Sequence, residues 1–264
     1  MKQTNWSWFD LAWPWVGLGA ATILFFFLFA TDKLREKLDV SRWLDPVWLS
    51  WLAPAAYMIH QFEEYGIDAQ GTRFAFPDFL CVSVGMPPYS ECTLPPAFFV
   101  AVNIPAVWIA GLVCGLLSWR HPFVGLGLYG LHFTNALSHL GVALVSGTYN
   151  SGALTAALVQ LPLSLWVAYA CFVQGSMRRR GMAVLILAGA LLSVILLGSV
   201  NLFAKGYLSA TTLVIIQILN PLCIIVVPWL FEKSVLRGNE RFEILRVPET
   251  SEVNSVRKTG MTPN

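Results

Sequence analysis

Charged residues are scarce in this chain: Asp, Glu, Lys and Arg make up 12% of its 264 residues, whereas 56% are hydrophobic. An ordinary globular domain carries about 25% charged residues. No phosphate-binding loop, nucleotide fold or nucleic-acid motif occurs, so no nucleic-acid partner is expected. The longest polar stretch, residues 232–264, is too short for a separate soluble domain. The composition predicts a multi-pass protein of the cell membrane, with membrane lipid as its surroundings.

Seven apolar runs have the length of about 17–25 residues that a helix needs to cross a bilayer. They lack the alternating pattern of barrel strands, so we expect an all-α bundle of seven transmembrane helices. The runs are Trp13–Ala30, Val47–Tyr65, Ala97–Trp119, Phe123–Val145, Ala153–Val173, Met182–Phe203 and Leu208–Phe231. Residues 1–231 are therefore the expected transmembrane domain, and 232–264 an expected disordered cytoplasmic tail. We expect the first run to remain as an anchor, not to be cleaved as a signal peptide.

Basic residues predict the orientation of these helices. When the seven runs are threaded alternately, only Lys2, Arg73 and Lys205 of the 17 Lys and Arg residues fall on one side, and the other 14 fall on the opposite side. Lys and Arg accumulate on the cytoplasmic side of membrane proteins. The amino terminus is therefore predicted to lie outside and the carboxyl terminus in the cytoplasm.

The outer loop at residues 66–96 carries Cys81 and Cys92, whereas the other three cysteines lie within apolar runs. An outer pair of cysteines can form a disulfide in an oxidising compartment, and two unpaired thiols are the alternative. The loop is long and rich in proline and phenylalanine. We expect it to be ordered and to act as a lid.

Ionisable residues inside the apolar runs are the main functional signal. His60, Glu63 and Glu64 lie in the second run, and His132 and His139 lie in the fourth. Such groups cost roughly 2.5–3.5 kcal/mol each near the centre of a membrane helix and normally mark function. Helical rise and periodicity place both sets at one height and each set on one helix face. We therefore expect the two stripes to face each other inside the bundle.

Further polar and small residues support this interior position. Asn135 shares the face of the two histidines in the fourth run, and Asn103 and Gln160 reach the same depth from the third and fifth runs. Small residues in the fourth run predict close approach of a neighbouring helix. They are Gly125, Gly127, Gly130 and Gly141.

Two imidazoles and one carboxylate are a common ligand set for zinc, with an open position for water and a second carboxylate as base. We expect a divalent metal ion, zinc first, and the candidate ligands are His60, Glu64, His139 and His132. The candidate catalytic residues are Glu63, Glu64 and Asn135, with the asparagine orienting a ligand or polarising a carbonyl. A dinuclear iron site, which needs about four carboxylates, ranks lower. A haem held by paired histidines would leave the glutamates unexplained.

Residues 60–64, His-Gln-Phe-Glu-Glu, have the pattern His-x-x-Glu-Glu, and residues 135–139 have the pattern Asn-x-x-x-His. Together, in a chain with several membrane helices, they resemble the family named for its HXXEE motif. The resemblance covers about residues 47–173. It implies that the shared elements are His60, Glu63, Glu64, Asn135 and His139. It implies no reaction, because the family has no settled biochemical function.

These features predict a metal-dependent, hydrolase-like membrane enzyme that acts on a lipid-like or amphiphilic small molecule near the outer leaflet. The alternative is a transporter or proton-coupled carrier, in which Glu63, Glu64 and His139 relay protons. A third hypothesis is a receptor or assembly subunit whose basic tail binds a cytoplasmic partner or anionic lipid. A retinal protein is excluded, because the last run contains no lysine.

Overall fold

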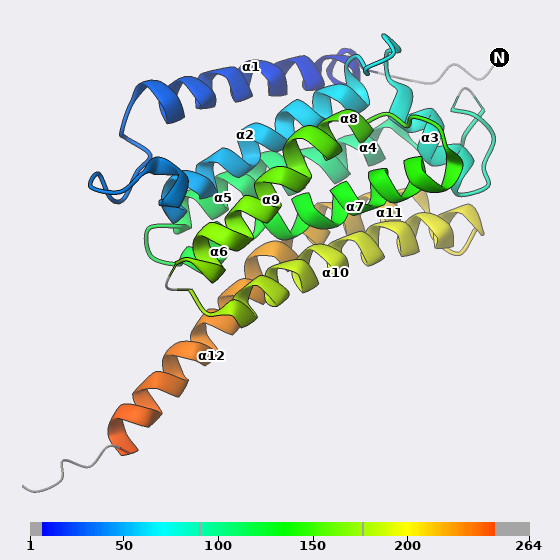
Figure 1. The fold of residues 1–264 in the computed structure, drawn as a ribbon. Coiled ribbons are helices and arrows are strands. Elements are labelled where there is room, and N and C mark those ends of the chain that lie inside the picture. Colours follow the sequence, from blue (N-terminus) through cyan, green and yellow to red (C-terminus); the bar gives the residue numbers. More distant parts are fainter. Residues whose placement is uncertain (1–6, 90, 176, 246–264) are drawn as a thin grey trace, which may run out of the picture.

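Seven helical rods, running alternately in opposite directions, form the bundle in the computed structural model, which describes residues 7–89, 91–175 and 177–245 (Figure 1). The first, second and sixth rods are α1 (Trp8–Ala30), α2 (Pro46–Tyr65) and α10 (Arg179–Ala204). The third rod is α4 (Pro96–Asn103), η2 (Ile104–Ile109) and α5 (Ala110–Leu117). The fourth is α6 (Pro122–Gly125) and α7 (Leu128–Ser146). The fifth is α8 (Ala153–Thr155), η3 (Ala156–Gln160), α9 (Leu161–Val167) and η4 (Ala168–Val173). The seventh is α11 (Ala210–Leu219), η5 (Asn220–Leu222) and α12 (Cys223–Leu245).

The described part contains no strand, so the all-α prediction is confirmed. Within the described ranges, five rods are long and apolar enough to cross a membrane, namely Trp8–Ala30, Pro96–Leu117, Ala153–Val173, Arg179–Ala204 and Ala210–Val235. The other two rods, α2 and α6 with α7, are more polar because they carry most of the site residues. α2 tolerates these residues because 17 of its 20 side chains are buried within the protein. That all seven rods cross a membrane remains a prediction.

Local signals fix where α2 begins and how α1 packs against it. The Asp45 carboxylate accepts hydrogen bonds from the backbone of Val47 at 2.9 Å and of Trp48 at 3.3 Å, which caps the first turn. At the other end of the helix, the ring of Tyr65 packs on Trp13 of α1 with centroids 5.0 Å apart. The cap at the start of α2 and the ring contact at its end therefore fix the position of the helix, including its last two turns.

The backbones of α7 and α10 lie in direct contact. A Cβ atom on Gly130 would lie 1.8 Å from the carbonyl oxygen of Leu185, and one on Gly189 would lie 2.2 Å from the carbonyl oxygen of Gly130. The predicted close approach is therefore confirmed at Gly125, Gly127 and Gly130. It is wrong for Gly141, whose Cβ position has nothing within 4 Å.

The outer loop is ordered. It contains the helix α3 (Ala75–Ser83) and a disulfide between Cys81 and Cys92, whose Cα atoms lie 6.1 Å apart. The ring of Phe76 from α3 lies 5.8 Å from the ring of His139, centroid to centroid. The loop therefore covers the part of the bundle in which the predicted site residues lie.

The carboxyl-terminal segment differs from the expected disordered tail. α12 continues to Leu245, so residues 232–245 are helical, and residues 246–264 lie outside the described part of the chain. The segment is rich in Glu, Lys, Arg and Leu, which have high helix propensity, so the helix does not end where the apolar run ends.

Candidate metal centre

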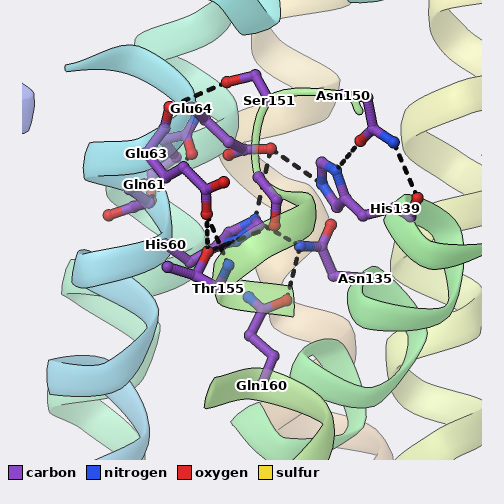
Figure 2. Close-up of polar contacts among 12 residues, drawn as sticks. His60, Gln61, Glu63, Glu64, Asn135, His139, Asn150, Ser151, Thr155 and Gln160 are labelled. Carbon is purple, nitrogen blue, oxygen red and sulfur yellow. Dashed lines mark hydrogen bonds and ion pairs between the residues drawn. The ribbon is translucent and has the colours of Figure 1, made fainter. Parts of the chain in front are cut away.

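The second and fourth rods bring three of the predicted residues to one point. His60 and Glu64 are one turn apart on α2, and His60 Nε2 lies 3.5 Å from Glu64 Oε1. His139 approaches from α7, with Nε2 at 3.1 Å from the same oxygen. All three side chains are buried. Their ligand atoms lie within 4.8 Å of one another, so these residues, the His/Glu group, could bind a metal ion (Figure 2).

Hydrogen bonds assign the tautomer of His60. The hydroxyl of Thr155 donates its proton to Glu63 Oε2 at 2.5 Å, so its oxygen accepts the 2.8 Å hydrogen bond from His60 Nδ1. Asn135 Nδ2 donates to His60 Nε2 at 2.8 Å. His60 therefore carries its proton on Nδ1, and its Nε2 lone pair accepts the hydrogen bond of Asn135 on the side where Glu64 lies.

Asn150 fixes the orientation of the His139 ring. Its Nδ2 atom donates to the carbonyl oxygen of His139 at 2.9 Å, and this orients the amide so that Oδ1 lies 2.8 Å from His139 Nδ1. The Nδ1 atom of His139 therefore carries a proton that it donates to Asn150. The Nε2 atom is left to face Glu64.

The centre of the His/Glu group thus brings two imidazole Nε2 atoms to one carboxylate oxygen. Among the described residues, only the two histidines are hydrogen-bond or ion-pair partners of the Glu64 carboxylate. A buried carboxylate is costly without a compensating cation. Histidine ligands of metals are typically neutral and donate their second ring N–H to a neighbouring oxygen, as both histidines do here. Two histidines and a carboxylate form the protein ligand set of zinc hydrolases and of iron(II) oxygenases.

Glu63 lies on the same helix but outside the His/Glu group. Its carboxylate accepts four hydrogen bonds, from the Tyr149 hydroxyl at 2.7 Å, the Leu154 backbone at 3.1 Å, and the Thr155 backbone and hydroxyl at 2.7 and 2.5 Å. Burial and the hydrogen bond to Glu63 raise the pKa of Tyr149, so the phenol keeps its proton and remains a donor. Glu63 is thus satisfied by donors, and it reaches His60 only through Thr155.

Asn135 lies at the edge of the His/Glu group. Its Nδ2 atom contacts His60 Nε2 and also donates to Gln160 Oε1 at 3.1 Å. Asn103 reaches the neighbouring region from α4, but its Oδ1 atom accepts a hydrogen bond from Gln61 at 3.0 Å. The structure therefore brings Asn135 and Gln160 to the group and gives Asn103 a separate partner.

His132 is not brought into the His/Glu group. It lies seven residues, about two helical turns, before His139 on α7. Its Nε2 atom is 2.9 Å from the carbonyl oxygen of Ala53, and its ring stacks on Tyr129 with centroids 5.4 Å apart. The structure therefore gathers three of the four predicted ligands.

The connector between α7 and α8, together with α8 itself, supplies supporting residues that the sequence patterns did not identify. Tyr149, Asn150 and Thr155 make the hydrogen bonds described above, and Ser151 donates to the backbone carbonyl of Glu63 at 2.9 Å. The available signal was a polar tetrapeptide, residues 149–152, directly before the fifth apolar run. Connectors between helices commonly contain polar residues, because they contact water. A polar tetrapeptide therefore does not by itself indicate residues that form hydrogen bonds to the site.

Gly152 was also missed. Its φ is +95°, and a Cβ atom there would lie 2.7 Å from His139 Cε1 and 2.8 Å from His60 Cε1. The glycine thus lets the connector pass directly over both imidazole rings. Glycine is the residue that adopts a positive φ without steric cost.

Replacing Thr155 with valine is expected to weaken metal binding by about 10–100-fold, because valine keeps the shape of the side chain but removes the hydroxyl that joins Glu63 to His60. Titration of metal-free protein with Zn²⁺ in competition with a chromophoric chelator measures the affinity. Thr155→Ser keeps the hydroxyl and should bind nearly as the native protein does. Equal affinities for the valine variant and the native protein would contradict the linking role.

The fold and the site together define an all-helical, membrane-type protein with a buried His/Glu cluster. Within it, residues 51–167 match the model of the HXXEE family, described as a protein of unknown function with HXXEE motif. The matched range contains the two motifs at 60–64 and 135–139, so the resemblance inferred from the sequence is confirmed. Comparisons with curated proteins and with solved structures give no match.

Proposed function

We propose that this protein is a membrane enzyme that holds one divalent metal ion at His60, Glu64 and His139. The proposal is supported by the convergence of two imidazole Nε2 atoms and one carboxylate oxygen at a buried point. A bound ion of this kind activates a water molecule as nucleophile or polarises a carbonyl oxygen. Zinc is the first candidate and gives a hydrolase-like reaction, and iron(II) shares the same ligand set.

The neighbouring side chains have separate roles in this proposal. Glu64 holds the ion, and Glu63 positions His60 through Thr155. Asn135 orients the substrate, because its amide lies 2.8 Å from His60 Nε2. Phe76 and the ordered outer loop exclude bulk water from the site. The second glutamate of the motif therefore serves as ligand and the first as a positioning residue.

The proposed topology has seven spans, with the amino terminus outside and the carboxyl terminus in the cytoplasm. The uneven distribution of Lys and Arg supports it. The connectors that follow α1, α5 and η4 lie at one end of the bundle, and those that follow α2, α7 and α10 lie at the other (Figure 1). The His/Glu group is near the second end, which this topology places toward the outer leaflet.

An apolar groove supports the proposal of a lipid-like or amphiphilic substrate. The groove has a volume of about 900 Å³ and lies between α1, α2 and the fifth rod. Its lining includes Ala56 and Val159, which are one helical turn from His60 and from Thr155, respectively. An acyl chain in this groove would have one end close to the His/Glu group.

Metal analysis of protein purified without chelator tests the proposal. The native protein is expected to contain about one divalent ion per chain, and Glu64→Gln to contain almost none, because glutamine removes the anionic ligand. Glu232→Gln is the matched control, since Glu232 is also buried and lies 3.6 Å from a histidine, His121, at the other end of the bundle. The proposal fails if the native protein binds no added Zn²⁺, Fe²⁺ or Mn²⁺, or if both variants bind equally.

A proton-coupled carrier is the second candidate function. Hydrogen bonds run without a break from Tyr149 in the connector through Glu63 and Thr155 to His60, and such chains carry protons in pumps and transporters. Proton uptake by liposomes containing the purified protein distinguishes the two. Uptake that Thr155→Val abolishes, in protein without bound metal, would favour the carrier.

A further inference from the structure

The carboxamide of Asn135 is bonded to the His60 nitrogen that would bind the metal ion. Its Nδ2 atom donates to His60 Nε2 at 2.8 Å, while the Thr155 hydroxyl is the partner of His60 Nδ1. Figure 2 shows the amide between the side chains of His60 and Gln160. Histidine binds a metal through the lone pair of one ring nitrogen, and that lone pair cannot accept a hydrogen bond at the same time. Metal binding at the His/Glu group therefore requires a change at Asn135.

The amide lies at the distance from His60 that is expected between two ligands of one ion. Atoms bound at about 2.0–2.2 Å from the same ion are roughly 2.8–3.6 Å apart, depending on the angle between the two bonds. Glu64 Oε1 is 3.5 Å from His60 Nε2 and 3.1 Å from His139 Nε2. The Asn135 amide, at 2.8 Å from His60 Nε2, has a spacing of the same kind. An amide nitrogen carries no lone pair for a metal, so the ligand atom at this position has to be the amide oxygen.

A half-turn of the Asn135 amide brings its oxygen to this position. The carboxamide is planar and its oxygen and nitrogen are similar in size, so the exchange of Oδ1 and Nδ2 needs little space. Without an ion, the exchanged oxygen would face the His60 lone pair and be repelled by it. With an ion, both lone pairs point at the cation, and carboxamide oxygens are known ligands of divalent ions. An ion therefore favours the turned amide, and the metal-free site favours the hydrogen bond to His60.

Gln160 is placed to support the turned amide. Its side chain is fully buried, its Oε1 atom accepts the hydrogen bond from Asn135 at 3.1 Å, and its Nε2 atom is a donor without a hydrogen-bond partner. If the Gln160 amide turns as well, this Nε2 atom donates to Asn135 Oδ1, and the unpaired donor obtains an acceptor. The hydroxyl of Tyr57 interacts with the Gln160 side chain and is a donor for its Oε1 atom in that arrangement.

We propose that Asn135 is the fourth protein ligand of the ion, through Oδ1, and that Gln160 is the positioning residue that holds its amide in this orientation. This inference rests on the proposed metal centre. The half-turn releases Nδ2 from His60, and this N–H group is then free to orient the substrate. A water molecule becomes a fifth ligand, a number that zinc reaches in some catalytic sites.

Titration with Co²⁺ in detergent, followed by visible absorption, tests this proposal, because the absorption reports both the affinity and the ligands of the ion. Asn135→Leu removes the carboxamide and should weaken Co²⁺ binding at least about tenfold, since even the hydrogen-bonding partners of metal ligands contribute about 10–100-fold. If the amide only blocked His60 Nε2, the same variant would free the lone pair and bind Co²⁺ more tightly. Asn103→Leu is the matched control, because Asn103 is also buried but has Gln61 as its partner. It should bind Co²⁺ as the native protein does.

Two further variants keep the test decisive if leucine at position 135 disturbs the fold. Asn135→Asp places an anionic oxygen at the same position, so it should bind Co²⁺ at least as tightly as the native protein and with a shifted absorption spectrum. Gln160→Met keeps the length of the side chain but removes the donor to the turned amide. It should weaken Co²⁺ binding, by less than Asn135→Leu does.

The outcomes separate this inference from the proposed function. If the native protein binds Co²⁺ but Asn135→Leu binds it as tightly or more tightly, the inference is overturned and the three-residue centre stands. An Asn135→Asp spectrum equal to the native one overturns it in the same way. Native affinity in Gln160→Met would show that Gln160 does not position the amide. If the native protein binds no metal ion, the proposed function itself fails.

Discussion

Gly152→Ala is expected to abolish metal binding at the His/Glu group. The added Cβ atom would lie 2.7 Å from His139 Cε1 and 2.8 Å from His60 Cε1, closer than such contacts occur in proteins. Neither ring can turn away without losing the hydrogen bond that fixes it, to Thr155 for His60 and to Asn150 for His139. The connector must therefore move off the rings, and the ligand atoms lose their common point. We expect an affinity loss of at least about 100-fold, since small displacements of ligands are costly.

Gly147→Ala is the matched control for this variant. Gly147 lies in the same connector and also has a positive φ, +67°, but its Cβ position has nothing within 4 Å. Alanine there should cost about 1–2 kcal/mol of stability from the backbone alone and leave metal binding intact. Metal content per chain and thermal unfolding in detergent are the two measurements. Equal metal content in both variants would show that Gly152 is required only for its backbone conformation.

The sequence predicted the seven rods and the three residues of the His/Glu group because strong energies determine both. Apolar runs of bilayer length have few alternatives to a helix, and an ionisable residue within such a run has few reasons to be there other than function. His60, Glu64 and His139 are such residues, and the structure brings them together. The helix-face argument also predicted that the two stripes meet inside the bundle.

The division of roles between Glu63 and Glu64 could not be predicted from the sequence. The two residues are neighbours on one helix, so they differ by about 100° in direction and hardly in height. Which of them faces α7 and which faces the fifth rod depends on the rotation of α2 in the bundle. That rotation is fixed by packing along the whole helix, with 17 of its residues buried.

The position of His132 shows a second limit. Residues on one helix face lie along a line, and they can be far apart on that line. His132 and His139 share a face but are seven residues, about 10 Å, apart along the helix axis. Metal ligands must lie within a few ångströms of one another. His132 and His139 are therefore too far apart to bind one metal ion together, and His132 bonds to the backbone of α2 instead.

Gly130→Leu is expected to destabilise the whole bundle by at least about 3 kcal/mol, because its Cβ atom would lie 1.8 Å from the backbone oxygen of Leu185. A clash with backbone is not relieved by a change of rotamer, so α7 and α10 must separate along this contact. Thermal unfolding and size-exclusion chromatography in detergent measure the loss.

Gly141→Leu is the control for this substitution, since Gly141 lies on the same helix with open space at its Cβ position. Leucine there should be neutral or stabilising by up to about 1 kcal/mol, because glycine is a poor helix former. The comparison also tests how the site is supported. Asn135 and His139 follow Gly130 on α7, so separating α7 from α10 displaces both of them from the residues of α2. Metal binding should therefore fall with the stability of Gly130→Leu, and a variant that unfolds earlier but binds metal normally would show that α10 has no part in supporting the centre.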